Sequence, residues 1–419
     1  MLKIVCINVM IAAVIMWASL YMLLSIFPSC YEWQESTPEQ DVSNAKIGQR
    51  NRKIDTISMQ ESINRVNIDQ HYMCKRWAVV YAMSYPTNAV RQIALDNNWC
   101  IVIVADIDSI SMDAYLTALG IRGRRIVFLN VDDQDILFSD LTAAIPLRHI
   151  GRKNVGYLFA MQNGAELIWD FDYNNQGILD INISNTRNTI DVLQRCSGKH
   201  KLFNPYPYFS VNETCIWPRG FPLEFVRDTS TSPELCKGNI SVESVGVFQS
   251  IAKTELDVDA TFRLTREYPV MFETAQTFPF ILIPRHSYCP FSERATLWTK
   301  QAFLYMALPT GVNSRVSDIW RSYIAQLFFH QKDINLVFSP PIIEQTSRDE
   351  TILEDLQAEM DIYKKSNSLI DFLQTFTFYH NTTLENLYED LYSRHFITLN
   401  DVYFIRKWVK SYSKVFIVD

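Results

Sequence analysis

Short apolar runs alternate with helical segments from Arg76 onward, and this alternation constrains the fold more than any other sequence feature. The runs are rich in Val, Ile and aromatic residues, which favour strands. Between them stand stretches with helical spacing, such as "TNAVRQIALDNN" and "RKNVGYLFAMQNG". Strands that alternate with helices form βαβ units and a mainly parallel sheet covered by helices. We therefore predict an α/β fold with strands in "WAVVYAM", "WCIVIVAD", "RRIVFLN" and "AELIWDFD".

Acidic residues follow two of these predicted strands. Asp106 closes the second strand, while Asp170 and Asp172 form a D-x-D pair at the end of the fourth. Ligands of such sheets bind beyond the carboxyl ends of the strands. Two carboxylates at this place can share Mn²⁺ or Mg²⁺, which would neutralise the charge that develops on a departing nucleoside diphosphate. We expect the fold to tolerate Asn at either position of the pair.

Two other interpretations of the D-x-D pair stay open. In the first, it is a turn in which Asp172 and Asn174 cap backbone groups. In the second, Asp170 is the nucleophile of a phosphatase of the haloacid-dehalogenase type. Such enzymes normally carry Thr or Val where this chain has Asn174.

Positive side chains open the helix that precedes the acidic strand. Arg152 and Lys153 stand at its start, where they could meet a diphosphate. With Asp106 they are our predicted cofactor-binding residues. The alternative is a solvated first turn of the helix.

The amino-terminal part of the chain predicts a membrane anchor. No charged side chain occurs from Ile4 to Phe27, a stretch long enough to cross a bilayer of ~30 Å as a helix. Lys3 before the run favours a cytoplasmic amino terminus and a lumenal body. We expect four regions: a cytoplasmic end with the anchor (1–30), a polar stem (31–75), the α/β domain (76–345) and a helical carboxyl-terminal region (346–419).

The composition excludes some classes of function. The net charge of −7 argues against a nucleic-acid binder, and no glycine-rich phosphate loop occurs among the 12 glycines. Six cysteines lie in the body, which in a lumenal compartment indicates disulfides with fifteen possible pairings. They are Cys74, Cys100, Cys196, Cys215, Cys236 and Cys289.

Several segments, in order, resemble one known family. They are "RWAVVYAMSYPTNAVRQIA", "RKNVGYLFAMQNGAELIWDFDYNN", "WPRGFPLE", "LDVDATFRLTRE" and "SDIWRSYIAQ". In these the chain resembles the STELLO-type glycosyltransferases, Golgi type II membrane proteins of plants with nematode relatives. The resemblance implies a GT-A-like domain, a nucleotide-sugar donor (a uridine diphosphate sugar first), Mn²⁺ or Mg²⁺ held by Asp170 and Asp172, and a glycan or glycoprotein acceptor. The family often has a third acid after the pair, where this chain has Tyr173.

The resemblance places the segment "LDVDATFRLTRE" in the acceptor half. Asp259, in a second D-x-D with Asp257, is a predicted catalytic residue that serves as a base or binds sugar hydroxyls, the alternative being a helix-start or loop salt bridge to Arg263 or Arg266. Asp318 is the predicted general base, oriented by Arg321 one turn later. The alternative for Asp318 is a helix acid that is merely paired with Arg321.

Three further predictions concern two histidines, two tryptophans and an alternative to an enzyme. His286 and His330 are possible third metal ligands, although a lone His is more often structural. Trp217 and Trp320 fit a core better than a sugar-stacking site. The rival to an enzyme is a catalytically silent GT-A-like scaffold that binds another membrane glycosyltransferase or a second copy of the chain.

Overall fold

The computed structural model of the protein describes residues 73–121, 123, 125–178, 188–211, 215–255, 257–266, 270–272, 280–345, 351–379 and 382–416. All of them belong to one compact unit, Ser62–Asp419. The other compact unit, Met1–Glu61, lies outside the described residues, as do the predicted anchor and nearly all of the predicted stem. The predicted boundary at residues 345–346 stays a prediction.

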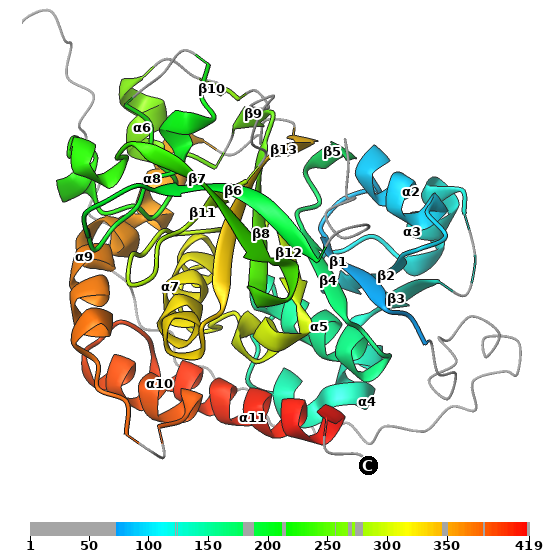
Figure 1. The fold of residues 1–419 in the computed structure, drawn as a ribbon. Coiled ribbons are helices and arrows are strands. Elements are labelled where there is room, and N and C mark those ends of the chain that lie inside the picture. Colours follow the sequence, from blue (N-terminus) through cyan, green and yellow to red (C-terminus); the bar gives the residue numbers. More distant parts are fainter. Residues whose placement is uncertain are drawn as a thin grey trace, which may run out of the picture. The chain divides into compact units, whose positions relative to one another are not determined.

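An 11-stranded sheet forms the centre of the described unit (Figure 1). Its order is β3-β2-β1-β4-β12-β8-β13-β11-β6-β7, with β5 beside β13. A separate pair joins β9 to β10. The strands are β1 (Arg76–Ala82), β2 (Cys100–Ala105), β3 (Ile126–Leu129), β4 (Leu167–Phe171), β5 (Asn175–Ile178), β6 (Thr189–Arg195), β7 (Leu235–Ser241), β8 (Val245–Ala252), β9 (Thr254–Glu255), β10 (Val270–Met271), β11 (Ile281–Leu282), β12 (Ala295–Thr299) and β13 (Asn335–Gln345).

The sheet is mixed, which corrects the prediction of a mainly parallel one. Strands β1 to β4 are parallel to one another, as the alternating sequence pattern predicted. Beyond β4 the direction changes, because β12 runs antiparallel to both β4 and β8. The pairs β11–β13 and β6–β7 are also antiparallel. The amino-terminal end of β12 therefore meets the carboxyl end of β4.

Helices cover both faces of the parallel strands. Alternate residues of β1 and β2 point to opposite faces. Val79 and Val102 pack in the cluster that contains Leu158 of α5, whereas Val80 and Ile103 pack with residues of α2 and α3. The helices are α2 (Asn88–Leu95), α3 (Met112–Leu119), α4 (Val131–Thr142), α5 (Lys153–Gln162), α6 (Ala260–Thr265), α7 (Ser314–Lys332), α8 (Ile352–Ala358), α9 (Met360–Thr375), α10 (Leu384–Ser393) and α11 (Leu399–Phe416).

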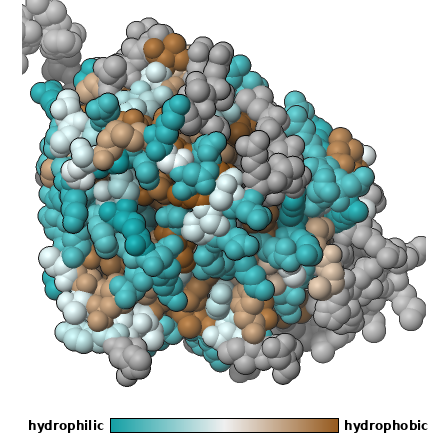
Figure 2. All heavy atoms as spheres, in the orientation of Figure 1, coloured by the Kyte–Doolittle hydropathy of each residue, from teal (hydrophilic) through white to brown (hydrophobic). Residues whose placement is uncertain are grey.

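The predicted helical carboxyl-terminal region is present as α8 to α11. Helix α11 packs along α4, α5 and α10, and α9 packs on α7 (Figure 1). Figure 2 shows hydrophilic side chains over most of the same view, with hydrophobic residues visible between them. This pattern fits amphipathic helices whose apolar faces are buried.

The structure corrects the prediction that the chain is a single-pass type II Golgi membrane protein. Across the described ranges, no helix combines the length and the apolar character that crossing a membrane requires. The physical reason is charge: the longest of these helices, α7, carries Arg315, Asp318, Arg321 and Lys332. The sequence run at residues 4–27, on which the prediction depended, lies outside the described residues.

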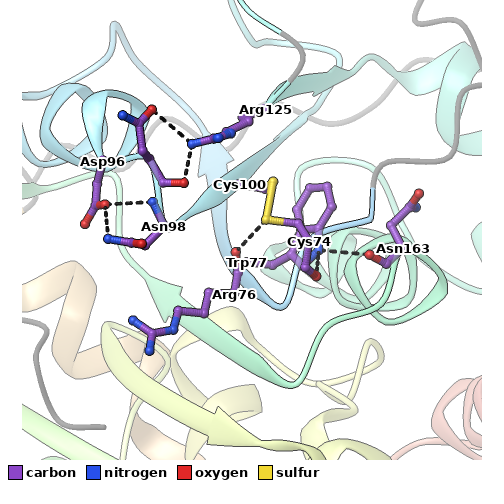
Figure 3. The surroundings of a disulfide bond; sticks show 9 residues. Cys74, Arg76, Trp77, Asp96, Asn98, Cys100, Arg125 and Asn163 are labelled. Atoms are coloured by element: carbon purple, nitrogen blue, oxygen red, sulfur yellow. Dashed lines mark hydrogen bonds between the residues drawn. A yellow bond between two sulfur atoms is a disulfide. The ribbon is translucent and has the colours of Figure 1, made fainter. Parts of the chain in front are cut away.

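Disulfides were predicted, and two are present. Cys74, just before β1, is bonded to Cys100 at the start of β2 (Figure 3). The backbone of Cys74 also donates to the carbonyl of Asn163 at 3.0 Å, which fixes the entry into the sheet. The second disulfide joins Cys196 after β6 to Cys236 in β7. Cys215 and Cys289 belong to neither of these two disulfides.

Candidate active site

Buried charges converge where β4 ends and β12 begins. Every residue that carries one of these charges is less than one-tenth exposed. Burying so many charges is costly unless they are paired with one another. We call the following residues the charged cluster: Lys153, Asp170, Asp172, Arg219, Asp257, Glu293, Arg294, Asp318 and Arg321.

Asp170, the penultimate residue of β4, lies at the centre of the charged cluster. It is fully buried and forms ion pairs with Lys153 and with Arg321, whose Nη1 lies 2.9 Å from Oδ2. The hydroxyl of Tyr157, one turn after Lys153 on α5, donates to the same oxygen at 2.7 Å. Three donors therefore surround a carboxylate that was predicted to face a metal ion.

Lys153 connects Asp170 to a second carboxylate. Its Nζ lies 2.8 Å from Oε2 of Glu293 and 3.1 Å from the carbonyl of Phe171. Burial opposes the lysine charge, but Asp170 and Glu293 together hold the pKa of Lys153 above its ordinary value. Burial raises the pKa of Glu293 to about 7; Lys153 lowers it, and the neighbouring Asp172 and Asp170 raise it further.

Asp172 stands at the edge of the sheet, beside Arg294. The Nε of Arg294 lies 3.6 Å from Asp172 Oδ2, and its Nη1 lies 3.5 Å from Asp257 Oδ1. The backbone of Asn174 donates to Asp172 at 3.3 Å, as the turn interpretation predicted. Both arginine contacts are longer than a hydrogen bond, so Arg294 is held more loosely than the other cations of the charged cluster.

Arg219 holds Asp257 and Asp318 together. Its Nη1 and Nη2 bind Asp318 at 3.0 and 2.6 Å, and its Nε binds Asp257 at 2.7 Å. Burial would raise the pKa of Asp257, but Arg219 and Arg294 keep it below its ordinary value. Asp318 was predicted to pair with Arg321; it pairs with Arg219 instead, and Arg321 reaches Asp170.

Three predicted site residues stand apart from the charged cluster. Arg152 donates to Gln134 of α4 at 2.8 Å. Asp106 accepts from the hydroxyl of Tyr81 at 2.6 Å and from the backbone of Arg148 at 2.8 Å. Asp259 caps α6, accepting from its own helix and from a buried tryptophan.

The predicted aromatic and histidine residues do not join the charged cluster either. Trp217 and Trp320 are buried in the main hydrophobic core, as predicted. The rings of His286 and His330 lie 5.5 Å apart, and both line a cavity described below. Burial is the main reason that the pKa of His330 falls to about 4.

The acid pair, as arranged, does not fit the predicted shared cation site. Asp170 is fully buried and already paired with Lys153 and Arg321, so a metal ion would have to displace these two cations. Asp172 alone remains, with Arg294 beside it. The residues that the structure describes contain no group of three or more His, Cys, Asp or Glu side chains that could hold a metal ion.

Sequence reasoning missed Arg219, Glu293 and Arg294. Arg219 stands in "WPRGFPLE", one of the segments that carry the family resemblance, so its motif was a usable signal. Glu293 and Arg294 precede β12, and Ala295 pairs with Phe171 of β4 in antiparallel register. That register brings both side chains to the D-x-D edge, but the pairing of β12 with β4 could not be read from local sequence.

The carboxyl-terminal quarter of the chain matches a known family. Residues 315–416, which run from α7 through α11, match the STELLO glycosyltransferases. "Probable glycosyltransferase STELLO1" of Arabidopsis thaliana is 25% identical over 321 residues, covering 72% of this chain and 39% of that relative. The chain is similar to the STELLO glycosyltransferases. "Probable glycosyltransferase STELLO2" of the same plant is 24% identical over 362 residues, covering 82% of this chain and 44% of that relative.

This similarity confirms the resemblance read from the sequence. The chain spans about two fifths of the length of the two curated STELLO relatives. Asp318 and Arg321 are the members of the charged cluster that fall within the family match at 315–416.

Solved structures of lower similarity were also found. Glucosyl-3-phosphoglycerate synthase from Mycobacterium tuberculosis with phosphoglyceric acid has a TM-score of 0.34 and 12% identity, covering 71% of this chain and 80% of that chain. The same enzyme with Mn²⁺, uridine diphosphate and glucosyl-3-phosphoglycerate has a TM-score of 0.33 and 11% identity, covering 73% of this chain and 81% of that chain.

Proposed function

We propose that this chain transfers a sugar from a nucleotide-sugar donor, a uridine diphosphate sugar first, to a hydroxyl of a glycan or glycoprotein acceptor. The observation that carries the proposal is the charged cluster at the carboxyl end of the parallel strands, where ligands of such sheets bind. The relationship to the STELLO glycosyltransferases supports the same class of reaction.

The charged cluster contains the two chemical functions that glycosyl transfer needs. A departing diphosphate requires positive charge, and the loosely held Arg294 can supply it at the edge marked by Asp172. An acceptor hydroxyl requires a base whose pKa lies near the working pH. Glu293, with its pKa raised to about 7, fits this role better than Asp318, which Arg219 holds by two hydrogen bonds.

The rival proposal is a silent scaffold that binds a partner glycosyltransferase. One observation favours it: the first acid of the D-x-D pair is closed by ion pairs, and Tyr173 stands where the family often has a third acid. Such a chain would keep the fold without binding a donor. Donor binding therefore separates the two proposals.

A nucleotide panel in a thermal-shift assay, with and without Mn²⁺, tests the proposal. Ligand binding stabilises the folded state by mass action, so a donor site shows itself without a known acceptor. We expect a uridine nucleotide to raise the melting temperature of the wild type, Arg294→Met to lose most of that shift, and Asp172→Asn to lose the part of it that requires Mn²⁺. The Mn²⁺ arm measures whether a cation contributes to donor binding.

The matched control is Asp140→Asn, which removes one negative charge from an exposed ion pair with Lys410. It should keep the full nucleotide shift. If no nucleotide shifts the wild type in either arm, the scaffold proposal replaces this one. Equal shifts in the wild type and both site variants would reject the site assignment.

A further inference from the structure

Two adjoining cavities lie outside the charged cluster and share His286 and Gln374. The first, of about 270 Å³, is lined by four basic side chains. The second, of about 500 Å³, is lined largely by ring-bearing side chains. No residue of the charged cluster lines either one. The basic residues are Arg195, Lys199, Lys201 and Arg285, and the ring-bearing residues include Tyr288, His330, Phe376 and Phe378.

The first cavity is a basic recess in a chain whose net charge is −7. No carboxylate is found among its described lining residues. Lys201 is paired with Asp371 and Arg285 with Asp333, which leaves two basic side chains without an ion pair among the described contacts. Those two, Arg195 and Lys199, make an anion the complementary ligand.

Arg195 is the anchor of this recess. Its guanidinium lies over the ring of Phe203, at 5.7 Å from the ring centre, and donates to the carbonyl of Leu202 at 3.3 Å. Its Nε is buried and has no hydrogen-bond partner in the described part of the chain. Burial lowers the pKa of Arg195, as expected for a partly desolvated cation without a counter-ion. An anion bound in the recess would supply the counter-ion that this guanidinium lacks among the described contacts.

The second cavity is lined mainly by ring-bearing side chains and not by Lys or Arg. Tyr288 and His330 meet edge to face at 4.9 Å between ring centres, and Phe376 and Phe378 meet similarly at 5.3 Å. Aromatic side chains provide an apolar surface for the C–H faces of a sugar ring, while polar groups at the rim receive its hydroxyls. A volume of about 500 Å³ is in the range of small-ligand sites.

We propose that the two cavities together bind an acidic saccharide, whose carboxylate or sulfate lies in the basic recess and whose sugar ring lies against the aromatic residues. Because His286 and Gln374 line both cavities, one ligand can reach from one to the other. The proposal does not depend on sugar transfer at the charged cluster and would hold for a scaffold too.

Isothermal titration with three disaccharides of similar size tests this site. The probes are a glucuronic-acid disaccharide, its sulfated form and neutral cellobiose, and sodium sulfate at matched ionic strength serves as the inorganic anion. We expect at least one acidic disaccharide to bind tenfold or more tightly than cellobiose and than sulfate. Which acidic disaccharide binds better identifies the anionic group. Binding of sulfate as tight as that of the acidic disaccharides, or equal binding of cellobiose, would overturn the proposal.

Two variants and a control locate the site. Lys199→Glu reverses an exposed charge in the basic recess, and His286→Asn alters the shared wall while keeping a residue type that tolerates the positive φ of 63°. Each should weaken the acidic disaccharide tenfold or more, whereas Lys364→Glu, exposed on α9 and outside both cavities, should not. Unchanged affinity in both site variants would reject the assignment. All three should keep any nucleotide shift.

Discussion

Arg321 on α7 donates a hydrogen bond of 2.9 Å to Asp170 at the end of β4, across 151 residues of sequence. Both side chains are completely buried, and the guanidinium also lies 5.1 Å from the ring centre of Trp298. This contact ties the parallel half of the sheet to the long helix behind it. The first acid of the D-x-D pair is therefore part of the core.

Asp170→Asn should destabilise the fold strongly, contrary to the sequence-based expectation that the strand end tolerates Asn. The substitution removes the carboxylate that pairs with Lys153 and Arg321. Removing one partner of a buried ion pair typically costs about 3–5 kcal/mol, because the remaining charge stays buried without compensation. Urea unfolding, followed by circular dichroism, measures the loss.

The control for this prediction is Glu389→Gln, which removes one negative charge from an exposed pair with Arg406. It should cost less than about 1 kcal/mol. Equal stability of Asp170→Asn and the wild type would mean that the ion pairs of Asp170 do not stabilise the fold. The carboxylate would then be free for a ligand.

Glu293 should make stability fall as the pH rises from 5 to 8. Burial raises its folded-state pKa from 4.5 to about 7, so the native protein holds a proton that the unfolded chain has already released in this range. Such a group stabilises the fold fully below its unfolded pKa and loses that contribution as the pH rises through 7. The contribution lost is about 2–3 kcal/mol.

Glu293→Gln isolates this effect, since Gln does not titrate. Unfolding free energies of both proteins at pH 5, 6, 7 and 8 should show the wild type losing stability relative to the variant. A constant difference across these pH values would contradict the raised pKa. In an assay of donor hydrolysis, followed as release of nucleoside diphosphate, the same variant should lose the limb of the pH profile that is centred near 7.

Gly156→Ala should destabilise the packing of α5 on the sheet. An added Cβ would stand 2.6 Å from Val104 Cγ2 and 2.8 Å from Val79 Cγ1, far closer than real contacts. Overpacking of this kind costs about 1–3 kcal/mol, which outweighs the gain of under ~1 kcal/mol from replacing a helical glycine. Gly123→Ala, which meets nothing within 4 Å, should change stability by less than ~1 kcal/mol. Similar melting temperatures for the two variants would contradict the close packing.

Local sequence patterns were sufficient to predict the parallel half of the fold. The four predicted strands appear as β1 to β4, and the predicted helices around Val90 and Leu158 appear as α2 and α5. Their β-branched runs and helical spacing each agree with the parallel α/β arrangement, so local and global preferences coincide. The carboxyl-terminal helices were predictable for the same reason.

The charged cluster was not predictable, because its contacts join distant segments. Arg321 has Asp318 one turn before it, which suggested a local pair, yet the two side chains find different partners. Arg321 lies beside Asp170 only because α7 packs behind a sheet in which β12 is inserted antiparallel to β4. Helical periodicity and motif spacing contain no information on such an insertion.

Asp259 offers the clearest test of a structural role against a catalytic one. Its contacts place it at the start of α6, where it caps the helix. Its carboxylate accepts from the backbone of Phe262 at 2.8 Å and from Trp217 Nε1 at 2.6 Å. Asn keeps an acceptor oxygen and caps helices as well as Asp, whereas Ala removes the cap and leaves the indole unsatisfied. We expect Asp259→Asn to cost less than ~1 kcal/mol and Asp259→Ala about 2–4 kcal/mol in urea unfolding.

Donor turnover, followed as release of nucleoside diphosphate, completes this test. If Asp259 acts only as a cap, Asp259→Asn should keep most of the turnover, since the helix start and the charged cluster stay in place. Thr351→Ala, at the capping box of α8, provides a cap loss of about 1 kcal/mol away from Asp259. A large loss of turnover in Asp259→Asn at unchanged stability would restore the catalytic role that the sequence predicted. The cap contacts would then coexist with chemistry at the same carboxylate.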